Sequence, residues 1–338
     1  MAPGVLTTSS LLTIIITTSV TPSAPSTELL SLVLESFRRH CPLLLNCRVI
    51  IVFDNYDRVT PTARLKKGCV TSEQAADYVL YKQNVKELFL RQYYQDSENV
   101  VFSQIEAKAE YGSPGDAQNV VNLIALQSHD KKVTFIEPAR RLGFGLAVRS
   151  ALRMTETPYT WVHQHDWVLL SDFPIDPLLE IMRASELDEE APIKYVCLPA
   201  IRMLSYAVSD AVMRFPALRE LTSSLKRDLS PASQPDIKVP LTPLFFWHDK
   251  PHIASTAHYL ARIFPTGLAI PRGDFIEDTL GQRARTQMKE GLWTKWACWL
   301  YYPDEGKQLC LRHLNGRAWP GSEREAEKIA RLRQQPEE

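Results

Sequence analysis

Several features that mark common function classes are missing from this sequence of 338 residues. Its 39 basic residues balance 39 acidic ones, which excludes a global field that attracts nucleic acid or anionic lipid. There is no Walker loop and no Gly-x-Ser-x-Gly nucleophile elbow. A dinucleotide-binding fingerprint starting at Gly143 fails, because Val148 stands where its third glycine belongs. Together with the absence of a nucleic-acid-binding module, this predicts no nucleic-acid partner.

Long apolar runs are also absent. The apolar stretch at residues 11–18 (LLTIIITT) falls far short of the roughly 20 residues that a membrane helix needs. A secretory signal has a basic residue before its apolar stretch, and no Lys or Arg precedes this one. Its β-branched residues favour a buried strand instead. We therefore expect no transmembrane segment, no targeting segment and a cytoplasmic location.

Paired cysteines of the C-x-x-C kind are missing too. Four of the six cysteines lie in or beside apolar runs, where a thiol behaves as a small hydrophobic group. We therefore predict buried free thiols, as in a reducing compartment. The cysteines are Cys41, Cys47, Cys69, Cys197, Cys298 and Cys310.

What is present is an alternation of strand-like and helix-like segments. Strands are expected at residues 11–18, 48–53, 132–136, 159–163 and 195–198, and helices at 27–40, 72–95 and 143–154. Thr27 is the expected N-cap of the first helix. This order predicts an α/β fold with a mostly parallel central sheet. Ligands bind such sheets outside the carboxyl ends of the strands, so polar residues there are candidates for a site.

Three segments carry a resemblance to a known family. Residues 141–152 (RLGFGLAVRSAL) resemble the N-x-G-x-a-x-a-R-N-x-a stretch of family 2 glycosyltransferases, which precedes a strand ending in an Asp-rich metal motif. Here residues 158–162 form that strand and 163–167 (HQHDW) follow it; residues 273–278 (GDFIED) resemble the family's late Glu-Asp motif. The resemblance implies a GT-A-like fold and a nucleotide-sugar glycosyltransferase acting on a hydroxyl acceptor.

The resemblance also implies a divalent metal, Mn²⁺ or Mg²⁺, on the donor diphosphate. The family's Asp-x-Asp motif reads Gln164-His165-Asp166 here, so its first carboxylate is missing. Asp166 is the expected ligand because both ions prefer oxygen. His313, matching a late histidine ligand of several GT-A enzymes, and His165 complete the expected set. The alternative is that Asp166 caps the turn after its strand.

His163 and His165 allow a different hypothesis. An H-x-H pair on a strand places both imidazoles on one face, which suits zinc. The metallo-hydrolase pattern H-x-H-x-D-H, however, requires Asp and His where Trp167 and Val168 stand. The commoner alternative is that one of these two histidines is simply hydrogen-bonded in the wall of the ligand-binding cleft.

For catalysis, the resemblance implies that Asp278 is the general base, with Glu277 and Asp274 as the next candidates. The alternative is that this acidic cluster begins a helix at residues 279–289 and is favoured there by the helix dipole. The residues expected to contact the nucleotide are Thr17, Thr18, Asp54, Arg141, Gly143 and Arg317. For Asp54, the alternative is a turn-forming residue beside Asn55.

The domain organisation follows from the same resemblance. We expect one domain over residues 1–320, with a nucleotide-binding half at 11–200 and an acceptor-side half at 201–320, then a charged tail at 321–338. Residues 227–240 are expected to be a loop. The aromatic residues between 241 and 317 are either a sugar platform or core. A non-catalytic GT-A-like binding protein remains the main alternative function, because the first metal carboxylate is missing.

Overall fold

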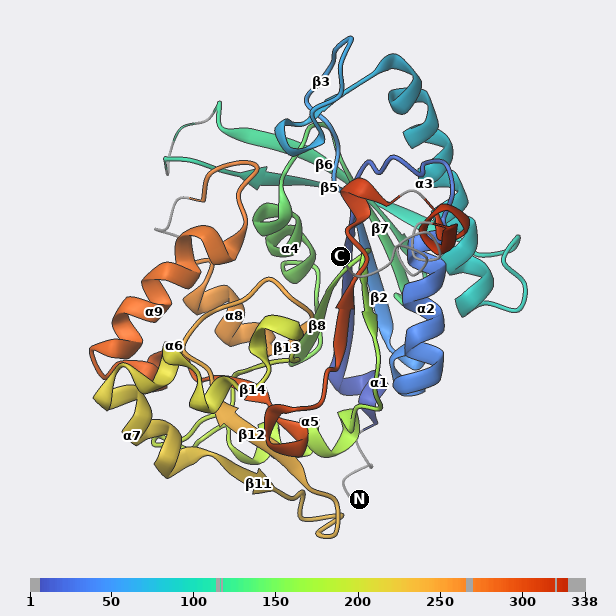
Figure 1. The fold of residues 1–338 in the computed structure, drawn as a ribbon. Coiled ribbons are helices and arrows are strands. Elements are labelled where there is room, and N and C mark those ends of the chain that lie inside the picture. Colours follow the sequence, from blue (N-terminus) through green and yellow to red (C-terminus); the bar gives the residue numbers. More distant parts are fainter. Residues whose placement is uncertain (1–6, 114–115, 117, 266–269, 320, 328–338) are drawn as a thin grey trace.

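A computed structural model describes residues 7–113, 116, 118–265, 270–319 and 321–327. One large sheet runs through this part of the chain, in the order β11-β12-β14-β10-β13-β8-β1-β2-β7-β6-β5 (Figure 1). Its strands are β1 (Leu12–Thr18), β2 (Arg48–Phe53), β5 (Phe102–Glu110), β6 (Val120–Ser128), β7 (Val133–Pro138), β8 (Tyr159–Gln164), β10 (Tyr195–Cys197), β11 (Arg227–Leu229), β12 (Val239–Pro243), β13 (His252–Ser255) and β14 (Cys298–Tyr301).

The α/β fold class is confirmed, but parallel pairing is confined to part of the sheet. β1 pairs in parallel with β2 and β8, β2 with β7, and β10 with β14. The remaining pairings in the sheet are antiparallel. The expectation of a mostly parallel sheet therefore holds only for the run β8-β1-β2-β7 and for the pair of β10 and β14, and the sheet as a whole is mixed. Local sequence patterns reveal which segments are strands, whereas the partner of each strand depends on long-range packing.

Two small sheets flank the large one. β3 (Arg58–Val59) pairs with β4 (Cys69–Val70), and β9 (Trp167–Leu169) pairs with β15 (Leu311–His313). The second pairing sets His313 opposite Trp167, directly after the end of β8. It thereby brings the late part of the chain to the carboxyl edge of the central strands.

Helices cover both faces of the sheet. Figure 1 shows α4 and α8 on one side and α2 and α3 on the other. The helices are α1 (Thr8–Leu11), α2 (Glu28–His40), α3 (Ser72–Tyr93), α4 (Phe144–Leu152), α5 (Ile175–Ala184), α6 (Asp210–Met213), α7 (Pro216–Leu225), α8 (Thr256–Arg262) and α9 (Gln282–Lys289). The three expected helices are present with slightly shifted ends. Thr27 occupies the N-cap position of α2, but its side chain makes no capping hydrogen bond.

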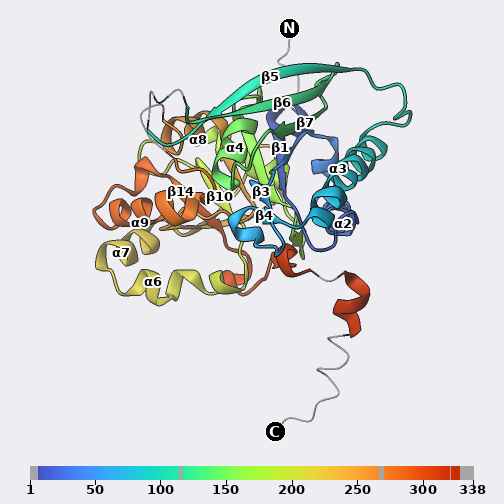
Figure 2. The same ribbon diagram turned by 90° about the horizontal axis from the view of Figure 1, so that it is seen from above.

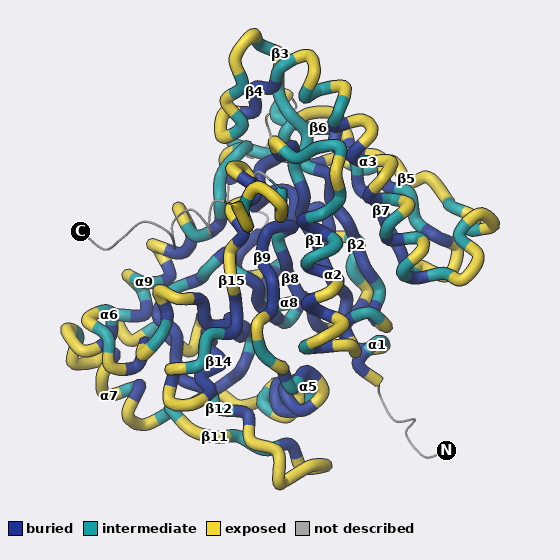
Figure 3. The backbone as a smooth tube through the Cα atoms, turned by 45° about the vertical axis from the view of Figure 1, so that its right-hand side comes forward, coloured by how far each residue is buried: buried dark blue, intermediate teal, exposed yellow. Residues whose placement is uncertain are grey.

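The core is continuous across the sheet and includes the late aromatic residues. Figure 3 shows the central strands buried and the tip that carries β3 exposed. Four tryptophans of the acceptor-side half are at most 1% exposed, so they pack in the core and form no sugar platform: Trp247, Trp293, Trp296 and Trp299. All six cysteines are buried free thiols, as predicted. Within the described ranges, no helix is both long and apolar enough to span a bilayer.

The structure departs from the sequence analysis at two places, where one hairpin was missed and one expected loop was wrong. The hairpin of β5 and β6, which forms one edge of the sheet in Figure 2, was not predicted. Most of β5 is exposed, so it lacks the apolar alternation that marks a half-buried strand. Residues 227–240 are not wholly a loop, because they contain β11 and the start of β12.

Candidate active site

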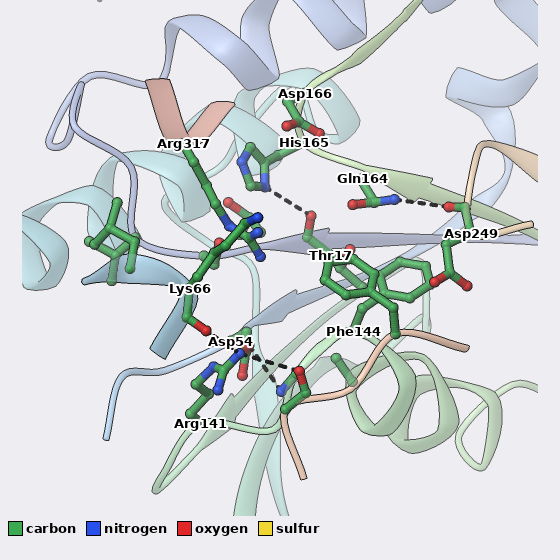
Figure 4. A pocket seen from close by; sticks show the side chains of 18 of the residues that line it. Thr17, Asp54, Lys66, Arg141, Phe144, Gln164, His165, Asp166, Asp249 and Arg317 are labelled. Atoms are coloured by element: carbon green, nitrogen blue, oxygen red, sulfur yellow. Dashed lines mark hydrogen bonds between the residues drawn. The ribbon is translucent and has the colours of Figure 1, made fainter. Parts of the chain in front are cut away.

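A cavity of about 480 Å³ opens at the carboxyl ends of the central parallel strands (Figure 4). Thr17 and Thr18 reach it from β1, Asp54 from the end of β2, and residues 164–166 from the end of β8. This is the position where open α/β sheets bind ligands. All six residues expected to contact a nucleotide line the cavity: Thr17, Thr18, Asp54, Arg141, Gly143 and Arg317.

Asp54 holds the turn that begins α4. Its Oδ1 accepts a hydrogen bond from the backbone N–H of Leu142 (2.6 Å), and its Oδ2 accepts one from Gly143 (3.1 Å). Burial raises the pKa of this carboxyl to about 6, against the opposing effect of those two N–H groups and of Arg141. Gly143 has φ 80°, and a Cβ there would lie 2.4 Å from the Cα of Gly273. Asp54 therefore shapes the cavity wall through the backbone.

The same side of the cavity carries three cationic side chains, Lys66, Arg141 and Arg317 (Figure 4). The Arg141 guanidinium donates to the carbonyl oxygens of Lys66 (3.1 Å) and Gly273 (3.3 Å). Arg317 lies with its guanidinium carbon 5.6 Å from the ring centroid of Phe275. Among the residues that the structure describes, none of the three cations forms a salt bridge with a carboxylate. This wall therefore has positive charge available for an anionic ligand.

Asp166 ties the end of β8 to the returning chain. Its Oδ2 accepts hydrogen bonds from His313 Nε2 (3.0 Å) and from the backbone N–H of Gly316 (2.9 Å). Burial alone would raise the pKa of Asp166, but the hydrogen bond from His313, the charge of His165 and the Gly316 N–H hold it well below its usual range. Asp166 is therefore ionised at neutral pH.

Two buried atoms near the end of β8 have the capacity to bind a divalent cation. Asp166 Oδ1 and His165 Nε2 are both buried and have no hydrogen-bond partner among the described residues. Both side chains flank Gly316, where a Cβ would lie 2.7 Å from His165 Nε2 and 3.0 Å from Asp166 Oδ2. His313 Nε2, in contrast, donates its proton to Asp166, so this nitrogen offers no lone pair in the present arrangement.

These donors fit a cation only in part. In the described part of the chain, no group of three or more His, Cys, Asp or Glu side chains is arranged to hold a metal ion. The atoms with free capacity are one carboxylate oxygen and one imidazole nitrogen, from Asp166 and His165. The metal site formed by Asp166, His165 and His313 therefore stays a prediction. In the present arrangement His313 serves as a hydrogen-bond donor to Asp166.

His163 does not share a site with His165. Its Nδ1 accepts a hydrogen bond from Trp161 Nε1 (3.1 Å), and its Nε2 lies 2.8 Å from the carbonyl oxygen of Trp167, to which it donates. Burial lowers the pKa of His163 to about 4. β8 ends at Gln164, so the alternation that would put both imidazoles on one face stops before His165. The expectation of a shared face is wrong, and His163 is a hydrogen-bonded core histidine.

The opposite wall of the cavity is acidic and begins at Glu277. This residue starts a π-helical turn (Glu277–Gly281) ahead of α9, a distortion that frequently marks functional sites. His248, whose Nδ1 lies 3.6 Å from Glu277 Oε2, and then Lys250 at 4.0 Å keep the pKa of Glu277 down, to about 2. Glu277 is therefore an ionised, charge-balanced group.

The structure separates the three acids expected to be catalytic. Glu277 lines the cavity, whereas Asp278 and Asp274 are not among its lining residues. Asp278 is exposed, and the backbone carbonyl of Asp274 accepts from the N–H of Gly145 (3.1 Å). The geometry thus offers no support for Asp278 as the group nearest to a bound acceptor.

Sequence reasoning missed Lys66, Lys250 and Asp249, which all line the cavity. Lys66 stands in the basic run at residues 64–67 between β3 and β4, and that cluster of charge beside two strands was the available signal. For the other two, no local pattern distinguishes residues 247–250 (WHDK) from any polar loop. Only the fold brings that loop to the end of β8.

Comparisons with known proteins give matches at the level of structure alone. No protein-family model matches the chain, and a search of curated proteins finds no match. The mannosyltransferase PcManGT from Pyrobaculum calidifontis, solved with GDP-Man and Mn²⁺, is 13% identical with a TM-score of 0.43, over 95% of this chain and 60% of that one. S. aureus TarS 1-349, solved with UDP-GlcNAc, is 10% identical with a TM-score of 0.40, over 95% and 65%.

A third similar structure is glucosyl-3-phosphoglycerate synthase from Mycobacterium tuberculosis, 11% identical with a TM-score of 0.27, over 85% of this chain and 78% of that one. The mannosyltransferase among them is a protein of the kind that the sequence resemblance names. The chain spans less than two thirds of the length of the first two structures. At these identities and TM-scores, the similarities assign no activity to it.

Proposed function

We propose that this protein transfers a sugar from a nucleotide-sugar donor to a hydroxyl acceptor. The observation that carries the proposal is one cavity with two chemically different walls, a cationic one of Lys66, Arg141 and Arg317 and an acidic one around Glu277. A departing nucleoside diphosphate needs positive charge, and an acceptor hydroxyl needs a carboxylate nearby. The two walls supply these needs on opposite sides of one space. Residues 1–320 form the domain that holds it.

The donor lies along the cationic wall in this proposal. Thr17 and Thr18 at the end of β1 approach the nucleoside, and Asp54 fixes the backbone of Gly143 beside it. Arg317 and Lys66 contact the diphosphate, because neither of their charged groups forms a salt bridge with a carboxylate within the described residues. Hydrogen bonds from a guanidinium to a phosphate are frequently paired, which also orients the ligand.

A divalent cation would be held by Asp166 Oδ1 with His165 Nε2, the two buried atoms that lack partners among the described residues. Such an ion would offset negative charge on the diphosphate as the donor bond breaks. Only one carboxylate is in reach of such an ion. The three cationic side chains therefore offset more of the negative charge on the diphosphate than they would in a site with two carboxylates. Donor binding is therefore expected to weaken, without being lost, when the metal is removed.

Thermal shift with nucleoside diphosphates and nucleotide sugars tests the proposal, each with Mn²⁺, with Mg²⁺ and with a chelator. A ligand at 100 times its Kd stabilises the native state by about 2.7 kcal/mol. With an unfolding entropy of roughly 0.7 kcal/mol/K for a chain of this size, that raises Tm by about 4 °C. No shift with any nucleotide under any condition would overturn the proposal.

A matched pair of variants locates the binding site. Lys66→Ala removes a charge from the cavity wall, and Lys67→Ala removes one from the adjacent exposed residue, which does not line the cavity. A charge-assisted hydrogen bond is worth about 1.5–3 kcal/mol, so the first variant is expected to weaken nucleotide binding by at least about tenfold. The second should bind as the wild type does. Equal affinities in the two variants would place the ligand elsewhere.

A further inference from the structure

The connection between β12 and β13 brings a second acid, Asp249, to the acidic wall of the cavity. Gln164, the last residue of β8, donates from Nε2 to the carbonyl oxygen of Asp249 (2.9 Å), which anchors this loop to the carboxyl end of the central strands. Figure 4 shows Asp249 beside Gln164, across the cavity from Asp54 and Arg141. Asp249 therefore stands on the side away from the cationic wall, where the acceptor is expected.

Asp249 and Glu277 hold each other in place through the backbone. The N–H of Glu277 donates to Asp249 Oδ2 (3.2 Å), and the N–H of Asp249 donates to Glu277 Oε2 (3.2 Å). This reciprocal pair links the loop before β13 to the π-helical turn before α9. Two carboxyl groups are thus fixed side by side by donors that carry no net charge.

The other carboxyl oxygen of Asp249 is free. Asp249 is 3% exposed, and its Oδ1 has no hydrogen-bond partner among the described residues. Within those residues Asp249 also forms no salt bridge, since Lys250 and His248 both approach Glu277. A buried polar atom without a partner is uncommon in native proteins, and a catalytic role is one of the reasons for it. The hydroxyl group of an acceptor is a donor of the required kind.

The charges around Asp249 suit a proton acceptor. Burial, and next the charge of Glu277, raise the pKa of the Asp249 carboxyl well above its usual value, with the Glu277 N–H opposing. A carboxylate with a raised pKa is a stronger base than an ordinary one, and general bases work best with a pKa near the working pH. The titratable groups that face it are Glu277, Asp278, Lys250, His248 and Tyr259.

We infer that Asp249, and not Asp278, accepts the proton of the acceptor hydroxyl in the transfer proposed above, on which this inference rests. The hydroxyl oxygen forms a bond to the anomeric carbon while its proton passes to Asp249 Oδ1. The bond from that carbon to the donor phosphate breaks, and its electron pair leaves with the nucleoside diphosphate. Glu277 is a positioning residue that fixes Asp249 Oδ2 through its backbone N–H and sets the basicity of the carboxylate through its charge.

Asp249→Asn is the first test, because the carboxamide oxygen retains an acceptor for the Glu277 N–H while the side chain no longer accepts a proton. Asp236→Asn is the matched control, an exposed aspartate outside both the cavity and the acidic wall. The assay measures release of nucleoside diphosphate from UDP-GlcNAc or GDP-Man with methyl glucoside or water as acceptor. Asp249→Asn should lose at least about 100-fold in rate, and its nucleotide affinity should stay within about twofold.

The pH profile separates a proton acceptor from a structural residue. The wild-type rate should rise with pH as Asp249 ionises. Glu277→Gln removes the neighbouring negative charge, so the rise should move to lower pH, and Asp249→Asn should lack it. Because Glu277→Gln retains both backbone hydrogen bonds, it keeps the inference testable if Asp249→Asn fails to fold.

The outcomes distinguish the two proposals. If the wild type binds nucleotide and transfers, but Asp249→Asn keeps its rate or Asp278→Asn loses more, the assignment of Asp249 is overturned and the proposed function stands. An unshifted pH profile in Glu277→Gln also overturns the assignment. If no nucleotide stabilises the wild type, the proposed function fails, and the assignment fails with it.

Discussion

The turn that Asp54 holds gives a quantitative prediction about stability. Burial raises the folded-state pKa of Asp54 to about 6, against about 3.9 in an unfolded chain. For an acid shifted upward, the contribution to stability is fully present below the unfolded pKa and is lost as pH rises through the folded pKa. The wild type should therefore lose stability between about pH 4 and pH 7 on account of this one group.

The size of the loss follows from the shift. Two pKa units correspond to about 3 kcal/mol, and since Asp54 is only partly buried, solvent screening reduces this to roughly 2 kcal/mol. Asp54→Asn removes the titration but keeps an acceptor oxygen for one of the two N–H groups. Its fixed cost, a buried N–H of Leu142 or Gly143 left without an acceptor, is about 1–3 kcal/mol at every pH.

Urea unfolding of the wild type and Asp54→Asn at pH 4.5 and pH 7.5 measures the pH-dependent loss of stability separately from the fixed cost of the lost hydrogen bond. The variant is expected to be less stable at pH 4.5. Because part of the wild-type loss is already complete at that pH, the difference from the wild type should shrink by roughly 1 kcal/mol at pH 7.5. Asp236→Asn, at an exposed position, controls for the general effect of removing a carboxylate. A constant difference between wild type and Asp54→Asn across this range would refute the argument that burial controls this carboxyl.

Three further predictions concern the metal side of the cavity and the core. Asp166→Asn should weaken the part of nucleotide binding that a chelator abolishes, and calorimetry showing unchanged Mn²⁺ dependence would remove Asp166 from the cation site. Gly316→Ala places a Cβ 2.7 Å from His165 Nε2, so it should cost about 1–3 kcal/mol in urea unfolding; a neutral effect would mean that this turn adjusts freely. Trp299→Ala empties a fully buried position and should cost about 3–5 kcal/mol, and a loss below 1 kcal/mol would contradict the packing described.

Much of the fold was accessible from local patterns. The strands at residues 48–53 and 159–163 were predicted almost to the residue. Short runs of β-branched and aromatic residues between polar ends are typical of buried strands. The hairpin of β5 and β6 was missed for the opposite reason. Its outer strand is exposed over most of its length, and edge strands of that kind carry little periodic signal.

Some residues of the candidate site were likewise found from the sequence, and others were missed. Residues that directly follow a central strand, such as Asp54 and Asp166, were found from the rule that ligands bind at the carboxyl ends of strands. The pairing of Asp249 with Glu277 was not found, and neither was the role of His313 as a hydrogen-bond donor to Asp166. These contacts join segments that are far apart in the chain, and no local periodicity records them.

The sequence by itself therefore determined five strands of the sheet, three of the helices and the polar groups at the strand ends, because hydrophobic periodicity and turn residues act over a few positions. Tertiary structure alone decided which of those groups meet. It buried His163, left Asp278 exposed and closed β15 on β9, so that Asp166 gained partners from the far end of the chain. Strand order and loop docking depend on how whole surfaces pack, and the environment of each carboxyl group depends on that packing in turn.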